Sequence, residues 1–120
     1  MRIKTQFVLL TLILATACRF ASAADAPLGD MSPFKQIADE TLKLVEKGDA
    51  KGAKTRIKDL ETAWDAAEPK LKAVNAASWT TVDKAIDLAL KEVRAAHPAA
   101  DKSSKSLKDL IAKFDAAHKK

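Results

Sequence analysis

Five carboxylates in the middle of the chain have the types and spacing needed to bind a cation. Glu61, Asp65 and Glu68 follow one another at steps of four and three residues, and Asp83 and Asp87 are four residues apart. Such steps place each set on one face of a helix. If the two helices pair antiparallel, the two acidic rows approach each other, and converging carboxylates bind hard cations such as calcium or ferric iron. The sequence therefore predicts a candidate metal site at these five residues.

The alternative is that these carboxylates form an ordinary solvated surface. Lys58, Lys72 and Lys84 lie among them in the sequence and would balance their charge. A second candidate pair, Asp115 and His118, has a three-residue spacing that could also bind a metal weakly. A histidine near a helix C-terminus more commonly compensates the helix dipole. Both interpretations remain open at this point.

Residue patterns of several catalytic and cofactor-binding classes do not occur in the sequence. Cys18 is the only cysteine, so no Cys-x-x-Cys-His haem motif is present. The only histidines are His97 and His118, and the sequence shows no serine or cysteine nucleophile for which either would be the base. Glycine-rich phosphate loops and calcium loops are also missing. We expect a non-enzymatic protein without a cofactor, and we keep a small enzyme as the less favoured alternative.

Helical patterns with clear start and stop signals must position the acidic residues. The first runs from about Pro33 to Lys47, with Ser32 as its N-cap and Gly48 closing it. The second begins after Asp49 and repeats an apolar residue at every third or fourth position, the strongest periodicity in the chain. Its apolar positions are Ala50, Ala53, Ile57, Leu60, Trp64, Ala67, Leu71 and Val74.

Two further helical patterns follow a proline in the second one. Pro69 cannot donate a hydrogen bond to the carbonyl of Asp65, which predicts a kink or a restart of that helix. The third pattern has Ser78 as its expected N-cap and ends at Pro98. The fourth follows the polar stretch 101–104. Short links between four amphipathic helices predict an all-α fold, an antiparallel four-helix bundle spanning residues 33–120.

Each helical pattern contributes one aromatic side chain to its apolar face. These side chains are Phe34, Trp64, Trp79 and Phe114. Large aromatics at helical spacing usually pack together, so we expect them to meet in one core. A ligand slot between the two tryptophans is the alternative.

The N-terminal residues predict where the protein is located. A basic start, an apolar run at residues 7–17 and the Ala-Ser-Ala triplet at 21–23 are typical of a secretory signal peptide at residues 1–23. Residues 24–32 would then form a flexible lead. We expect a periplasmic protein. Because Cys18 lies in a loose lipoprotein-type context, a membrane-anchored lipoprotein is the alternative.

Charge and length restrict the classes of partner. Removing the signal peptide would leave 97 residues, one small domain, and would lower the formal net charge from +5 to +2. Basic and acidic residues then alternate along every segment, whereas nucleic-acid binders cluster their basic residues on one face. We therefore expect no nucleic-acid partner, and membrane contact only if Cys18 is lipidated. The expected partner is another envelope protein or a small ligand.

Two segments of the chain carry a family resemblance. Residues 57–68 together with residues 79–87 resemble small secreted helical proteins of proteobacteria, which have no established role and are sometimes loosely labelled as histidine kinases. The same residues have a fainter similarity to the extracytoplasmic helical segment of bacterial high-affinity iron permeases. This chain has neither the membrane helices nor the Arg-Glu-x-x-Glu motifs of those permeases, and it has no nucleotide-binding pattern. The resemblance implies a helical envelope protein that could act beside a permease.

These observations favour one function and leave a second open. The favoured function is a non-enzymatic binding or accessory module of the cell envelope. The alternative is a periplasmic protein that handles iron or another cation through the five carboxylates.

Overall fold

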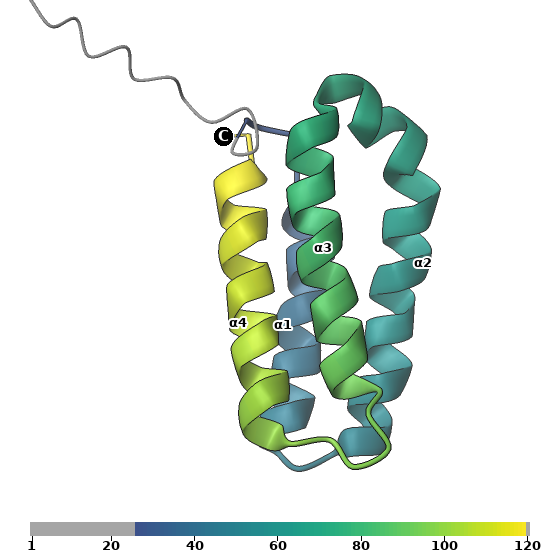
Figure 1. The fold of residues 1–120 in the computed structure, drawn as a ribbon, viewed down its shortest axis with the longest axis vertical. Helices are drawn as coiled ribbons and strands as arrows, with labels where there is room; N and C mark the ends of the chain where they lie inside the picture. The colour runs from purple at the N-terminus through teal and green to yellow at the C-terminus, as the bar shows by residue number, and fades with distance from the viewer. Residues whose placement is uncertain (1–25, 120) are drawn as a thin grey trace, which may run out of the picture.

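The computed structural model describes residues 26–119, and four helices make up most of this part of the chain. They are α1 (Ser32–Glu46), α2 (Ala50–Val74), α3 (Ala76–Val93) and α4 (Ala100–Ala117). Each helix runs antiparallel to the one before it (Figure 1), and α1 and α3 each pack against both α2 and α4. No strand occurs within residues 26–119. The all-helical prediction is confirmed for this part of the chain.

The expected signal peptide and the alternative lipid-bearing residue, Cys18, lie outside the described residues. Within residues 26–119, no helix combines the length and the apolar character that crossing a bilayer requires.

The link between α1 and α2 confirms two of the predicted helix signals. Gly48 has a φ of +79°, the left-handed conformation that glycine adopts with little strain just after a helix. The Asp49 side chain then accepts a hydrogen bond from the Gly52 amide at 2.8 Å. This bond satisfies one of the free N–H groups at the start of α2.

Two predicted N-caps are wrong. Ser32 is the first helical residue of α1, and the Asp30 side chain accepts the Ser32 amide at 2.9 Å. Asn75 is the N-cap of α3, because its side chain accepts the Ser78 amide at 2.9 Å. In both cases a carboxylate or amide just upstream in the chain provides the acceptor.

Ser78 has a different role from the predicted one. It is fully buried, and its hydroxyl donates to the carbonyl of Ala26 at 2.6 Å. The polar stretch 101–104, expected to precede the fourth helix, is instead the first turn of α4.

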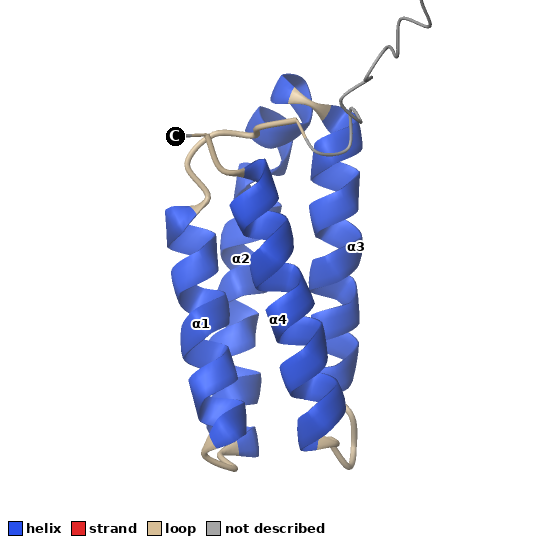
Figure 2. Cartoon of the chain, turned by 90° about the vertical axis from the view of Figure 1, so that its left-hand side faces the viewer, coloured by secondary structure: helices blue, strands red, loops and turns tan. Residues whose placement is uncertain are grey.

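Part of the segment expected to be a flexible lead is packed against the bundle. Leu28 and Met31 are buried, with 3% and 1% of their surface exposed. The Leu28 amide donates to the carbonyl of Ala117 at 2.8 Å, and the Lys119 amide donates to that of Gly29 at the same distance. Figure 2 shows this segment crossing the end of the bundle beside the C-terminus. Two apolar side chains and two backbone hydrogen bonds therefore hold residues 28–31 in place.

The core follows the predicted apolar faces, with deviations at the two ends of α2, where Ala50 and Val74 are exposed. Ile57, Leu60 and Trp64 are fully buried. The helix continues through Pro69 and bends over the end of the bundle (Figure 1), as a proline in a helix interior requires. Leu71 is buried beyond the bend, but Val74 is 55% exposed.

Candidate functional site

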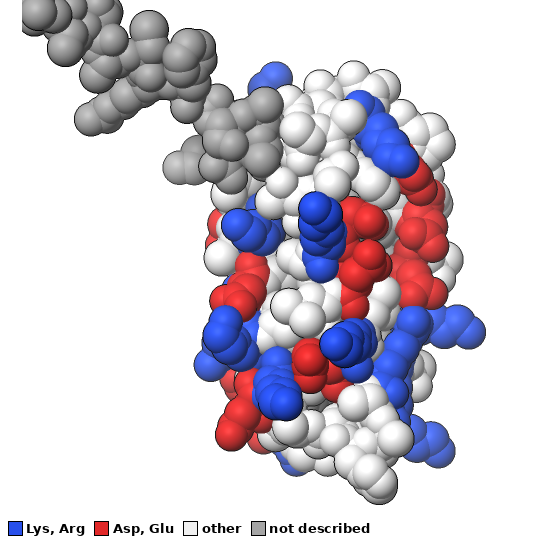
Figure 3. Space-filling model, in the orientation of Figure 1, with Lys and Arg blue, Asp and Glu red and all other residues white. Residues whose placement is uncertain are grey.

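The predicted acidic residues lie on α2 and on the side of α3 that faces α2. Figure 3 shows acidic side chains gathered over these two helices. The rows come close enough to interact, because the charges of Asp87, Glu68 and Asp65 all raise the pKa of Asp83. The two acidic rows therefore approach each other, as the sequence predicted for antiparallel helices.

The structure does not group these carboxylates as a metal site. Within residues 26–119, no three histidine, aspartate or glutamate side chains are placed to hold one metal ion. Glu61 instead forms an ion pair with Arg94 at 2.7 Å, and Glu68 forms one with Lys72 on the next helical turn. Two of the five predicted ligands are thus paired with basic side chains of the protein. The five residues predicted as a metal site were Glu61, Asp65, Glu68, Asp83 and Asp87.

Asp83 is the most perturbed of these carboxylates. Its side chain accepts a hydrogen bond from the Trp64 indole Nε1 at 3.1 Å. Partial burial raises the pKa of Asp83 most strongly, the neighbouring charge of Asp87 raises it further, and the Trp64 hydrogen bond opposes both effects. The charged form of Asp83 therefore costs stability. A perturbed carboxylate of this kind is a common mark of a functional position.

The four aromatic side chains form one continuous cluster, as predicted. Phe34 packs edge-on against Trp64 at a centroid distance of 5.3 Å and stacks with Phe114 at 6.1 Å. Trp64 contacts Phe114 at 6.0 Å. Trp64 and Phe114 are at most 1% exposed, so the cluster is part of the buried core, toward the end of the bundle where α1 and α3 begin and α4 ends.

The alternative of a ligand slot between the tryptophans does not fit this geometry. The rings of Trp64 and Trp79 lie 6.1 Å apart between centroids, with their planes within 10° of each other. This separation is typical of two aromatic rings in direct contact. The Lys72 ammonium covers the ring of Trp79 at 4.2 Å, a cation–π contact.

The Trp79 indole N–H is a buried donor with no hydrogen-bond partner among the described residues. Trp79 is 8% exposed. It thus differs from Trp64, whose indole N–H is paired with Asp83. Sequence periodicity predicted the burial of both rings but could not distinguish their N–H groups.

The predicted Asp115 and His118 pair does not form a metal site. Asp115 pairs with Lys35 at 2.7 Å. The His118 Nδ1 accepts the Met31 amide at 3.1 Å and lies 3.6 Å from Asp30. His118 therefore helps to attach the N-terminal segment to the bundle.

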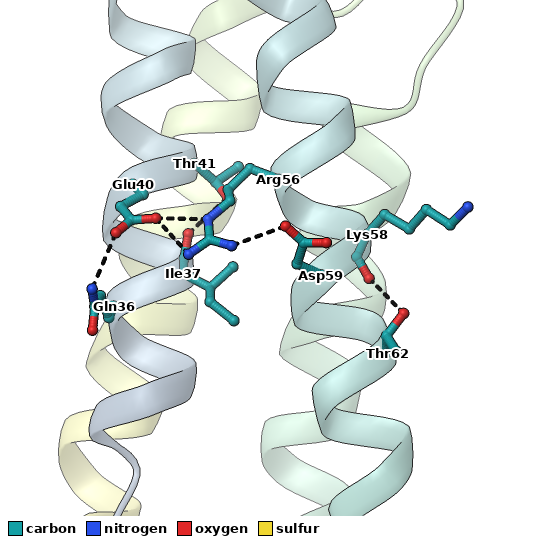
Figure 4. A network of polar contacts seen from close by, with 8 residues as sticks. All are labelled: Gln36, Ile37, Glu40, Thr41, Arg56, Lys58, Asp59 and Thr62. Atoms are coloured by element: carbon teal, nitrogen blue, oxygen red, sulfur yellow. Dashed lines mark hydrogen bonds and ion pairs between the residues drawn. The ribbon is translucent and has the colours of Figure 1, made fainter.

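A polar network joins α1 to α2 on another face (Figure 4). The Arg56 guanidinium contacts Glu40 at 2.6 Å and Asp59 at 2.9 Å, and Gln36 donates to Glu40 at 3.2 Å. The Arg56 hydrogen bond lowers the pKa of Glu40. Each charge has an opposite partner, so this network serves to connect two helices.

The structure shows a surface feature that the sequence reasoning missed, a groove between α3 and α4. Its wider part has a volume of about 530 Å³ and is lined by Ala85 and Leu88 from α3 and by Ala112 from α4. Leu88 is 47% exposed. The signal was present in the sequence, since Leu88 falls outside the apolar face of its helix pattern.

Comparison of the chain with family models, with curated proteins and with solved structures found no match. The resemblance to secreted proteobacterial helical proteins therefore stays a prediction.

Proposed function

We propose that the protein is a non-enzymatic binding or accessory module of the cell envelope, exported to the periplasm by cleavage after Ala23, and that it binds another protein through its surface. The observation that carries this proposal is the packed interior of the bundle. Aromatic rings around Trp64 and Phe114 fill it toward one end, and buried aliphatic side chains such as Ile57, Ile86 and Leu107 fill the rest. Bundle proteins that hold metals or cofactors build those sites from inward-facing polar side chains at this place. Binding at the surface is the use that remains for a bundle packed in this way.

The surface supports the same proposal. The groove between α3 and α4 exposes Leu88, one of two large apolar side chains on the surface of the described residues. The metal-handling alternative has no comparable support, because ion pairs hold Glu61 and Glu68.

Native mass spectrometry of the protein expressed with its own N-terminus and released from the periplasm tests the proposal. We expect a chain that begins at Ala24, together with a protein-sized adduct. A stoichiometric metal or small-molecule adduct would contradict surface binding of a protein. A lipid-bearing Cys18 in the membrane fraction would contradict the proposed processing.

A further inference from the structure

The groove between α3 and α4 is the candidate surface for binding another helix. Its wider part adjoins a narrower part of about 140 Å³, and Leu88 and Asp109 line both. Ala85 from α3 and Ala112 from α4 both line the wider part. Small side chains let the backbone of another helix approach closely, and the exposed Leu88 supplies an apolar contact.

The charge of the groove selects the partner. Its lining includes four lysines and two carboxylates, and one of the carboxylates, Asp109, is already paired with Lys105 at 2.7 Å. Figure 3 shows an uncoloured area toward α4 that is bordered by both basic and acidic side chains. The lysines are Lys84, Lys102, Lys105 and Lys113. An acidic partner complements this rim, whereas a basic one is repelled.

We propose that this groove binds an amphipathic helix of a partner protein, with apolar residues on one face and Asp or Glu flanking them. This inference rests on the proposed surface-binding function and names its partner class. An anionic membrane surface is less favoured, because the apolar residues line a hollow between two helices, which a helix can enter more closely than a flat lipid surface.

The test uses a fluorescent synthetic helical peptide with leucines at helical spacing and flanking glutamates. A matched peptide with lysines in place of the glutamates, and vesicles of phosphatidylglycerol, serve as the competing probes. We expect the acidic peptide alone to bind the full-length mature protein. Leu88→Ala should weaken binding about tenfold, which corresponds to about 1.4 kcal/mol.

Charge reversal makes the test independent of folding. The double variant Lys84→Glu with Lys113→Glu should no longer bind the acidic peptide and should bind the lysine peptide instead. An unfolded protein could not produce this exchange of specificity. The matched control, Lys51→Glu with Lys70→Glu, changes the same charge on α2 and should bind as the parent does.

Three results would overturn the inference: no binding of the acidic peptide, equal binding by the groove variant and its control, or preferential binding to the vesicles. The proposed function fails differently. If native mass spectrometry shows a protein adduct that the groove variant retains, the module binds a protein elsewhere. If it shows no protein adduct, the proposed function itself is contradicted.

Discussion

At the scale of single residues, Asp83 has two opposing effects on the stability of the fold. It accepts the Trp64 indole N–H, yet burial and three neighbouring carboxylates raise its pKa. The Trp64 indole N–H needs a hydrogen-bond acceptor at residue 83, but that acceptor does not have to be charged. Two substitutions separate these properties.

Asp83→Asn should raise the free energy of unfolding at neutral pH, because it keeps a carbonyl acceptor for Trp64 and removes the repelled charge. Asp83→Ala leaves a buried indole N–H unpaired and should be about 1–3 kcal/mol less stable than Asp83→Asn. Urea unfolding of the three proteins measures this order. An Asn variant less stable than the Ala variant would show that the acceptor has no role.

The stability difference between Asp83→Asn and the parent protein should depend on pH. Because the folded-state pKa of Asp83 lies above its ordinary value of 3.8, its contribution to stability is fully present below pH 3.8 and is lost as pH rises through the raised pKa. The stability advantage of Asp83→Asn should therefore be largest at neutral pH and shrink toward acid pH. An advantage that grows on acidification would contradict the raised pKa.

The burial of Trp64 leads to a second prediction. Trp64 contacts three other aromatic rings and is 1% exposed. Trp64→Ala should lower the free energy of unfolding by about 3–5 kcal/mol, a large share of the stability of a domain of this size. A loss below about 1 kcal/mol in denaturant unfolding would show that the ring is not part of the core.

At the scale of the helices, the sequence predicted apolar faces better than helix ends. Steps of three and four residues identified the buried faces of all four helices, because burial follows directly from that periodicity. The N-cap of α3 was missed because Asn75 and Ser78 are both good capping residues, and the choice depends on a tertiary contact. The Ser78 hydroxyl is needed at Ala26, 52 residues away in the sequence.

The N-terminal segment was misjudged for a related reason. Residues 26–31 contain proline, glycine and aspartate, which are typical of a flexible lead. Leu28 and Met31 are isolated apolar residues with no periodicity of their own. Their burial depends on the end of α4, which no local pattern could reveal.

A matched pair of leucines tests this part of the account. Leu28→Ala should lower the free energy of unfolding by about 2–5 kcal/mol, because Leu28 is 3% exposed. Leu88→Ala removes the same atoms from a side chain that is 47% exposed and should change stability by less than about 1 kcal/mol. Thermal unfolding followed by circular dichroism compares them. Equal losses would contradict the packing of the N-terminal segment.

At the scale of the whole molecule, the two faces of α3 differ in charge. Toward α2 lie Asp83 and its acidic neighbours, and toward α4 lie the lysines of the groove. The sequence predicted the acidic face because its residues share helical spacing on each of two segments. For the groove it offered only Leu88, outside the apolar face of its helix. The rest of the lining comes from two helices and includes alanines that carry no signal of their own.

On our proposal, the bundle binds a partner protein at the groove between α3 and α4 and binds nothing inside its aromatic core. Backbone amide chemical shifts of the isotope-labelled mature protein, recorded while periplasmic extract is added, test it most directly. We predict shifts concentrated on residues 81–92 and 102–113, with the two indole N–H signals unchanged. Shifts centred on the indoles of Trp64 and Trp79, or on the acidic residues of α2, would contradict the claim.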